Sequence, residues 1–284
     1  MVLVTAFAVT SATWKGFEVR VVDEIRALGV RRGDVLMVHG SLRKVGGDAR
    51  DLVAAIDEAV GEEGTWMMTL GAEDECSWVN ERPEDERADL LEESAPFDKL
   101  TARAEADNGV LAEVFRTTPG TVVSDHPEGR FGARGRLADE LTADVPWDDY
   151  YGAGSPLERF TQHKGRVLRL GADVDTVTLL HYAEWRAPIE NKRRVRRHRV
   201  VRADDGQPVV RVIDTLDDSE GIADYDGVEE DEFGVILNEY LGTGRAKHGK
   251  VGGAQAELIE AHDLVEFAVD WIVTHAASPH QPQS

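Results

Sequence analysis

Residues 166–184, RVLRLGADVDTVTLLHYAE, constrain this chain more than any other segment. The first residues form a largely apolar run that is typical of a buried strand, and a glycine interrupts the run. Thr176 then offers a hydroxyl that can cap a helix. Within that helix Thr178, His181 and Glu184 recur at i, i+3 and i+6, which places them along one side. The segment therefore predicts a strand, a turn and a helix that presents a hydroxyl, an imidazole and a carboxylate together.

The N-terminal third of the chain alternates between helical and strand-like apolar patterns. Residues 14–28 and 48–60 repeat their apolar side chains at helical spacing, whereas residues 34–39 and 64–70 are short apolar runs. Strand, helix and strand in this order are typical of an α/β fold, with helices packed on a layered and largely parallel sheet.

The same signals predict the elements of the remaining chain. These are a helix over residues 110–116, a strand over 121–123, a helix over 156–163 capped by Ser155, an edge strand over 192–199, a hairpin turn at Asp205-Gly206 into a strand over 209–213, and helices over 228–240 and 263–274 that flank a glycine-rich basic loop. We predict one α/β catalytic domain over residues 1–284, with a loose tail at residues 277–284.

Residues 72–108 interrupt this alternation. Acidic residues outnumber basic ones there, and Pro83 and Pro96 break the apolar periodicity. So long a loop in a compact domain is either a functional lid or a solvated surface insertion, and the sequence leaves both open. An acidic lid would attract an amine.

The charge of the chain excludes some classes of partner. The formal net charge is −22, whereas nucleic acids and anionic membrane surfaces are bound through lysine and arginine. We therefore predict neither nucleic acid nor membrane as a partner. A polycationic ligand suits this charge, although surplus acid also serves solubility alone.

Cysteine usage and the N-terminus bear on location. Cys76 is the single cysteine, which excludes an internal disulfide and a multi-cysteine zinc site. The apolar start lacks the basic region and cleavage site of a secretory signal, and it is too short for a membrane span. We predict a cytoplasmic protein.

Three histidines sit where ligands bind in α/β folds. His39, His126 and His181 each lie at or just past the C-terminal end of a predicted strand. A single histidine is more often a packed residue than a catalyst, but three at one sheet edge favour a site.

The pair His181 and Glu184 allows two interpretations. The carboxylate can hold the imidazole as a general base, or both groups can bind a metal ion. A second such pair and an H-E-x-x-H motif are both absent from the sequence, so we predict no metal. A third feature, the turn VHGSLRKVG, offers backbone N–H groups and positive charge to phosphates.

Several stretches together carry a family resemblance. The stretches VHGSLRKVG, GEEGTWMM, SDHPEGRFGARG, GAGSPLERF, RLGADVDTVTLLHYAEWR and VGGAQ, in this order, resemble the aminoglycoside 3-N-acetyltransferase family over about residues 21–276. The resemblance implies an enzyme that uses acetyl-coenzyme A and acetylates the 3-amino group of 2-deoxystreptamine aminoglycosides. It also implies the α/β fold of antibiotic N-acetyltransferases, unlike the common N-acetyltransferase fold.

The resemblance assigns catalytic and coenzyme roles to individual positions. His181 matches the catalytic histidine, Glu184 the carboxylate that follows it, and His126 the histidine of a His-Pro step. With the basic side chains of the phosphate turn, the residues predicted to bind coenzyme A are His39, Ser41, Leu42, Arg43, Lys44 and Thr178.

The proposed chemistry needs a base, donors for an oxyanion and acids for the cationic substrate. His181 is the predicted base because its pKa lies near working pH. The oxyanion donor can be Thr178 or the backbone of residues 40–46, and the sequence leaves this choice open. The predicted substrate-binding acids are Glu73, Asp74, Asp98, Asp148 and Glu184, the last of which can instead orient His181.

The chain departs from the family pattern where substrate range is decided. Residues 72–96 have their own sequence, KLTAR follows PFD, and Asp125 replaces a neutral residue. Two other functions stay open: a metal-dependent hydrolase that uses His39, His126, His181 and Glu184, and a non-catalytic protein that binds cationic antibiotics.

Overall fold

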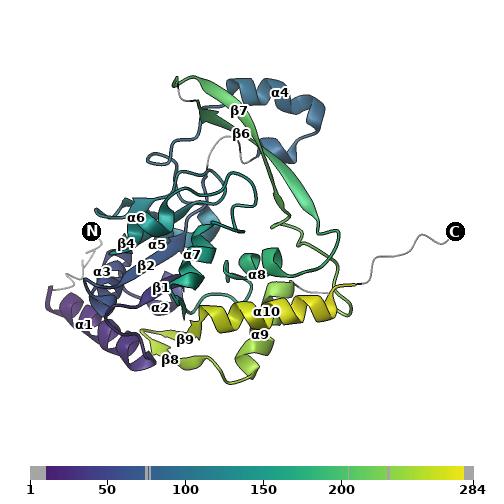
Figure 1. The fold of residues 1–284 in the computed structure, drawn as a ribbon. Coiled ribbons are helices and arrows are strands. Elements are labelled where there is room, and N and C mark those ends of the chain that lie inside the picture. Colours follow the sequence, from purple (N-terminus) through teal and green to yellow (C-terminus); the bar gives the residue numbers. More distant parts are fainter. Residues whose placement is uncertain (1–10, 74–75, 77, 204, 229–230, 278–284) are drawn as a thin grey trace, which may run out of the picture.

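Seven strands form one mixed sheet, in the order β3-β4-β2-β1-β5-β9-β8, and two further strands form a separate ribbon (Figure 1). The computed structural model describes residues 11–73, 76, 78–203, 205–228 and 231–277. The strands are β1 Val35–Gly40, β2 Thr65–Thr69, β3 Val122–Val123, β4 Phe131–Gly135, β5 Arg166–Leu170, β6 Arg194–Arg202, β7 Pro208–Leu216, β8 Lys247–Val251 and β9 Ala254–Glu260. The helices are α1 Ser11–Leu28, α2 Leu42–Val45, α3 Ala49–Val60, α4 Glu84–Glu93, α5 Gly109–Thr117, α6 Ala138–Thr142, α7 Pro156–Gln162, α8 Leu180–Arg186, α9 Glu232–Gly242 and α10 Ala261–His275, with 3-10 turns at Val79–Glu81 and Ala106–Asn108.

The predicted α/β class is confirmed, but the sheet is parallel only at its centre. β1 pairs in parallel with β2 and β5, whereas β4, β3, β9 and β8 join antiparallel. The expectation of a largely parallel core is therefore wrong for the outer strands. The short turns that join β3 to β4 and β8 to β9 explain two of these antiparallel pairs, because a tight hairpin can join only antiparallel strands.

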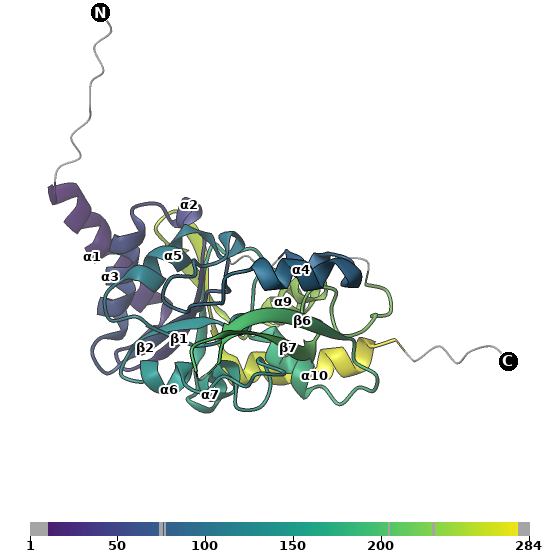
Figure 2. The ribbon, with the colours of Figure 1, turned by 90° about the horizontal axis from the view of Figure 1, so that it is seen from above.

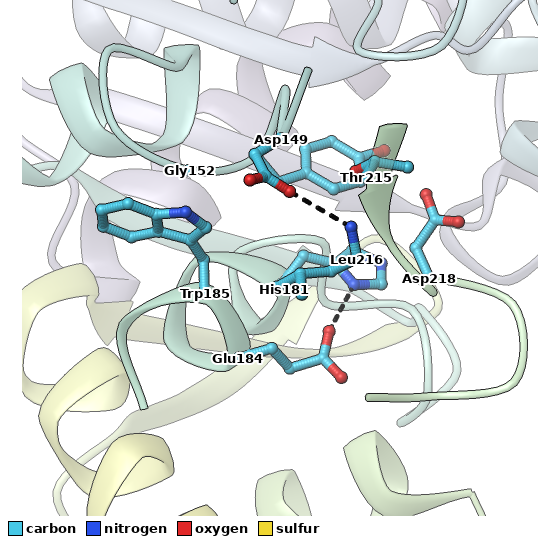
Figure 3. Close-up of a pocket in the computed structure, with 9 residues that line it drawn as sticks. Asp149, Gly152, His181, Glu184, Trp185, Thr215, Leu216 and Asp218 are labelled. Atoms are coloured by element: carbon cyan, nitrogen blue, oxygen red, sulfur yellow. Dashed lines mark hydrogen bonds and ion pairs between the residues drawn. The ribbon is translucent and has the colours of Figure 1, made fainter. Parts of the chain in front are cut away.

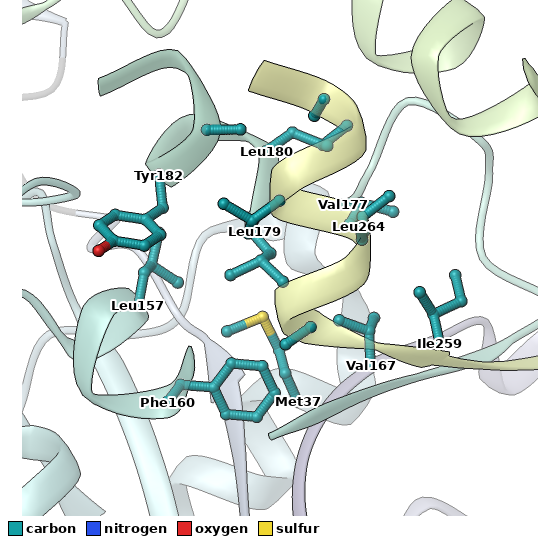
Figure 4. Packing of buried hydrophobic residues seen from close by; sticks show 14 of the residues in the cluster. Met37, Leu157, Phe160, Val167, Val177, Leu179, Leu180, Tyr182, Ile259 and Leu264 are labelled. Carbon is teal, nitrogen blue, oxygen red and sulfur yellow. The ribbon is translucent and has the colours of Figure 1, made fainter. Parts of the chain in front are cut away.

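Each face of the sheet has its own apolar core. One core packs α1, α3 and α5 against Trp66, Met68 and Leu168. On the other face α6 to α10 pack against Met37, Met67 and other residues that point the opposite way, as the two-residue period of strands requires (Figure 4). Val177, just before α8, and Leu180 and Ala183 of α8 are fully buried in this second core.

β5 is buried along its whole length although it contains two arginines. The Arg169 guanidinium lies 3.1 Å from the Glu257 carboxylate of β9, and it donates to the carbonyls of Ala172 and Asp173. Arg166 forms an ion pair with Asp34 and donates to a backbone carbonyl. Paired in this way, the two cations are compatible with a central strand.

The sequence predicted a loop for the glycine-rich basic segment after α9, and this prediction is wrong. The segment contains β8 and the turn into β9. Val251 pairs with Ala254, so Gly252-Gly253 is a two-residue hairpin turn. Gly252 has a φ of 59°, and a Cβ there would lie 2.2 Å from the Val45 carbonyl oxygen. β4 was also missed, because FGARG is poor in strand-forming residues.

The arginine-rich segment forms a strand, as expected, but in a ribbon apart from the main sheet. β6 and β7 pair from Arg194↔Leu216 to Arg202↔Pro208, and the predicted Asp205-Gly206 turn joins them. Helix α4 lies beside this ribbon (Figures 1 and 2). The side-chain amide of Asn80 accepts from the backbone N–H of His198 and donates to its C=O. The acidic insertion therefore covers part of the edge of β6.

Buried Arg130 ties the acidic insertion to the main sheet. It follows the turn before β4, and its guanidinium donates to four backbone carbonyls at 2.7–3.0 Å, those of Gly71, Lys99, Ala102 and Arg103. A planar cation with several fixed donors suits such a cluster of carbonyls. The acidic insertion predicted over residues 72–108 contains helix α4 and two 3-10 turns, and Arg130 anchors its C-terminal part to the main sheet.

Replacing Arg130 tests this anchor. We expect Arg130→Met to lower the free energy of unfolding by roughly 3 kcal/mol or more, because each carbonyl left unpaired in the interior costs about 1–3 kcal/mol. Arg136→Ala is the control, since Arg136 is exposed and faces Glu63 at 3.7 Å. Urea unfolding measures both, and the predicted single domain should unfold in one transition. Equal small effects of both changes would refute the anchor.

Candidate active site

Helix α8 starts later than the sequence predicts. The Thr176 hydroxyl donates to the Asp173 carbonyl and does not cap the helix, which begins at Leu180. Thr178 therefore lies in the turn before the helix, not on it. It nevertheless stays next to the helix start, because the His181 N–H donates to the Thr178 carbonyl at 3.1 Å.

His181 and Glu184 form a directed pair. The His181 Nδ1 lies 2.8 Å from the Glu184 Oε2, as the spacing of one helical turn allows (Figure 3). Only 2% of the Glu184 side chain is exposed, compared with 19% for His181. The bond leaves Nε2 as the ring nitrogen that can exchange a proton with a ligand.

Two aromatic rings hold the imidazole on its faces. The Tyr151 ring lies parallel to it with 4.8 Å between centroids, and the Phe233 ring of α9 lies at 4.7 Å with a tilt of 58°. These rings come from segments far apart in sequence. Together with Glu184 they restrict the rotation of the imidazole.

The surroundings of His181 favour its protonated form. Burial lowers the pKa of His181, but the hydrogen bond and charge of Glu184, with the charges of Asp218 and Glu232, raise it by more. The pKa of His181 therefore lies above its ordinary value of 6.5. His181 can act as a base near neutral pH, and its cationic form is stabilised.

A cavity of about 490 Å³ opens at His181 and is lined with acids. Glu105, Asp107, Glu128 and Asp218 contribute to its wall, and none of them was among the predicted site residues. Burial and the nearby charge of Glu128 raise the pKa of Glu105. This acidic cavity suits a ligand with several positive charges. We call it the acceptor cavity, after the acetyl acceptor that the resemblance predicts.

The ribbon supplies the opposite wall of the acceptor cavity through arginines that hold its acids in place. Arg197 forms an ion pair with Asp218, and the Tyr150 hydroxyl donates to the same carboxylate at 2.6 Å. Arg199 donates to Glu128 at 2.6 Å. The basic run that the sequence placed on an edge strand thus positions carboxylates for a cationic ligand.

A second cavity of about 220 Å³ adjoins the first, and we call it the coenzyme cavity after the ligand predicted for its turn. His39, Ser41 and Asp173 line it, and it shares Thr69, Asp107 and Asn108 with the acceptor cavity. Lys44 lies at its rim, where its Nζ is 2.6 Å from Asp173. Burial and the charge of Arg169 lower the pKa of His39 to about 3, so His39 is neutral.

His126 has both ring nitrogens occupied. Its Nδ1 accepts from the N–H groups of Glu128 and Gly129, and its Nε2 lies 3.0 Å from the Trp147 carbonyl. These bonds require the neutral Nε2–H tautomer, and burial lowers the pKa of His126 to about 4. His126 therefore fixes the turn that carries Glu128.

The comparison with known proteins identifies the family. A family model described as Aminoglycoside 3-N-acetyltransferase matches residues 37–273. The chain belongs to the aminoglycoside 3-N-acetyltransferase family. It is similar to aminoglycoside N(3)-acetyltransferase III of Pseudomonas aeruginosa, with 39% identity over 254 residues that cover 88% of this chain and 91% of the relative. Aminoglycoside N(3)-acetyltransferase VII of Streptomyces paromomycinus is 36% identical over 264 residues, 89% of this chain and 90% of the relative.

Solved structures of aminoglycoside acetyltransferases share the fold. That of AAC(3)-Xa has a TM-score of 0.87 and 36% identity, and it covers 92% of this chain and 93% of its own. A binary complex of AAC-IIIb with CoASH and a complex of AAC-VIa with sisomicin both have TM-scores of 0.84. The AAC-IIIb complex is 35% identical, and the match covers 93% of this chain and 98% of the AAC-IIIb chain. The AAC-VIa complex is 37% identical, and the match covers 92% of this chain and 98% of the AAC-VIa chain. The expected antibiotic N-acetyltransferase fold is confirmed, and the chain is an acyltransferase that acetylates aminoglycosides, an activity that confers resistance.

Most of the acids predicted to bind substrate lie away from the acceptor cavity of the acetyltransferase. Glu73 is exposed and pairs through its backbone with Arg103, and Asp148 accepts from the Asp214 N–H. Asp98 lies in a neighbouring cavity of about 530 Å³ with Trp147 and Arg211. Asp74 lies outside the described residues. The acids of the acceptor cavity come from three separate segments, and no local pattern marks them.

Leu42 and Arg43 belong to the short helix beside the coenzyme cavity, and they do not line it. Leu42 packs on the apolar core of that face, and Arg43 is exposed.

Within the described part of the acetyltransferase, no three His, Cys, Asp or Glu residues are grouped as a metal ion would require. Nor does that part contain a helix long and apolar enough to cross a membrane.

The protonation of His181 provides a test of the pair. We expect a pKa above 6.5 for His181 in the folded acetyltransferase, and a lower pKa in Glu184→Gln, where burial then dominates. Because folding raises this pKa, its stabilising contribution is complete below pH 6.5 and is lost as pH rises through the folded pKa. NMR titration of the imidazole measures the pKa, and urea unfolding at several pH values measures the sign. An unchanged His181 pKa in Glu184→Gln would contradict the pairing.

Proposed function

We propose that the enzyme transfers the acetyl group of acetyl-coenzyme A directly to the 3-amino group of a 2-deoxystreptamine aminoglycoside, with His181 as general base. The observation that carries this proposal is the His181–Glu184 pair, whose imidazole lines an acid-walled cavity adjoining a second cavity. A relative of similar fold binds CoASH, and another binds sisomicin. These two ligands are of the kinds that the two cavities would hold.

His181 performs the proton transfers in this proposal. The substrate loses its ammonium proton to solvent, and Nε2 of His181 then accepts a proton from the amine as it attacks the acetyl carbon. Glu184 stabilises the imidazolium that forms. The imidazolium returns the proton to the coenzyme A thiolate when the carbon–sulfur bond breaks, so the enzyme ends in its starting state.

Positioning contributes more than the base to the proposed rate. A general base contributes about 10²–10⁴-fold, whereas holding two reactants in attack geometry contributes roughly 7–11 kcal/mol. The shared wall of the two cavities, formed by Thr69, Asp107 and Asn108, is where we expect amine and thioester to meet. The near-complete burial of Glu184 favours orientation of His181 over contact with a substrate amine.

The first turn after β1 is the proposed coenzyme site. His39 and Ser41 would contact the pantetheine arm from the cavity wall, and Thr178 would lie near the thioester. Arg43 and Lys44 would bind phosphates at the rim, with Leu42 anchoring their short helix. Local positive charge is needed there because the chain has a net charge of −22.

Two groups of acids have separate proposed roles. Glu105, Asp107, Glu128 and Asp218 would bind amines of the substrate in the acceptor cavity. Glu73, Asp98 and Asp148 would act only at a distance, by attracting the cation to this side of the enzyme. We also propose that His126 serves catalysis by holding Glu128, with both nitrogens engaged. A cytoplasmic location, where acetyl-coenzyme A is made, fits this activity.

Release of coenzyme A tests the reaction and His181 together. Wild-type enzyme with acetyl-coenzyme A should release free thiol with one or more aminoglycosides, whereas His181→Ala should lose about 10²–10⁴-fold in kcat and still bind coenzyme A. The wild-type rate should rise with pH through the raised pKa of His181, since only the neutral ring is a base. Binding without thiol release would instead support sequestration, and loss of turnover with a chelator would support a metal-dependent hydrolase.

The role of the acceptor acids is tested at Glu105. We expect Glu105→Gln to raise KM for the aminoglycoside roughly tenfold or more at little cost in kcat, because a charge-assisted hydrogen bond is lost. Glu92→Gln, on the exposed surface of α4, is the matched control and should leave KM unchanged. Steady-state kinetics at fixed ionic strength measures both. Equal shifts in the two variants would point to long-range attraction and not to binding in the cavity.

A further inference from the structure

We propose that Thr69 is a positioning residue that aims the hydroxyl of Thr178 at the thioester oxygen of the reacting acetyl group. This inference rests on the proposed acetyl transfer and adds the donor that stabilises its oxyanion. It is carried by the side-chain hydrogen bond between the two threonines.

Thr69 lies at the junction of the two cavities. It is the last residue of β2, at the end of a central strand of the sheet. Its side chain lines both the coenzyme cavity and the acceptor cavity, whereas Thr178 lines the acceptor cavity together with His181. A thioester that extends from one cavity into the other must pass these two hydroxyls.

In the proposal Thr69 is the donor and Thr178 the acceptor, which leaves the Thr178 proton available. The Thr69 Oγ1 donates to the Thr178 Oγ1 at 2.9 Å. A hydroxyl has one proton to donate, so Thr69 uses its own proton here, and Thr178 keeps its proton for another acceptor. Donation into an oxygen also polarises that hydroxyl and strengthens the bond that it donates onward.

Backbone contacts hold Thr178 relative to the base. The His181 N–H donates to the Thr178 carbonyl at 3.1 Å, and Leu179 and Leu180, which lie between these two residues in the chain, are fully buried. The hydroxyl is therefore fixed from two directions, by the backbone of the His181 turn and by the side chain from β2. A preorganised donor of this kind costs no reorganisation during the reaction.

The proposed step balances without a change in Thr69. The amine nitrogen forms a bond to the acetyl carbon, the carbonyl electron pair moves to oxygen, and Thr178 donates a hydrogen bond to that oxygen. When the pair returns, the carbon–sulfur bond breaks, and the thiolate takes a proton from His181. Neither threonine transfers a proton, so both act by hydrogen bonding alone.

A purely structural threonine pair would look the same in the fold, so the test depends on kinetics. The variants are Thr69→Val, Thr69→Ser, Thr178→Val and the double variant Thr69→Val/Thr178→Val. We expect Thr178→Val to lower kcat by about 10²–10³-fold, the usual loss of one oxyanion donor. Thr69→Val should lower kcat by about three- to tenfold, as expected for one hydrogen bond, and Thr69→Ser should keep the wild-type rate.

The double variant separates positioning from independent catalysis. If Thr69 acts through Thr178, the double variant should be no slower than Thr178→Val, and KM for acetyl-coenzyme A should be unchanged throughout. Additive losses, a wild-type kcat in Thr69→Val, or a larger loss at Thr69 than at Thr178 would each overturn the proposal. Thermal melts of all variants identify any that are merely unfolded.

The outcomes distinguish this proposal from the proposed function. If the wild-type enzyme releases no coenzyme A with any aminoglycoside, acetyl transfer itself fails. If the wild-type enzyme turns over and Thr69→Val matches it, only the role of Thr69 fails. Thr65→Val is a control from the same strand, because Thr65 is fully buried at its other end and should affect stability without this change in kcat.

Discussion

Buried charge must be paired, and this constraint determines which charged side chains can lie near His181. This acidic chain buries the Glu184 carboxylate and leaves only 16% of the Asp218 side chain exposed. His181 stabilises the first and Arg197 the second. Removing one partner of such a pair leaves an uncompensated charge in the interior, which is strongly destabilising. The fold and the site are therefore held by the same contacts.

In the proposed reaction, the two cavities would hold a polyanionic and a polycationic ligand apart. The acceptor cavity has a wall of carboxylates, which the arginines of the ribbon keep in place. The coenzyme cavity lies beside basic side chains of the turn after β1. The acidic residues near the site thus gather on the wall of the acceptor cavity. The arginines of β6 allow this, because they pair with the carboxylates of Asp218 and Glu128.

The pairing of His181 with Glu184 could be predicted because it is local. His181 and Glu184 are one helical turn apart, and this spacing alone brings their side chains together. The prediction of Thr176 as a cap was wrong because a hydroxyl can also bond its own turn, and sequence does not distinguish the two uses. His126 was singled out for its place after a strand, but only its neighbours in space show that both its nitrogens are engaged.

The sequence by itself determined the α/β class, the family and the pair on helix α8, since periodicity and motif order are properties of neighbouring residues. Tertiary structure alone decided which acids line the acceptor cavity, because Glu105, Glu128 and Asp218 come from separate segments. It also decided that Tyr151 and Phe233 enclose His181, and that Thr69 meets Thr178 across 109 residues of chain. Such contacts depend on strand order and on the packing of distant helices, which no local pattern encodes.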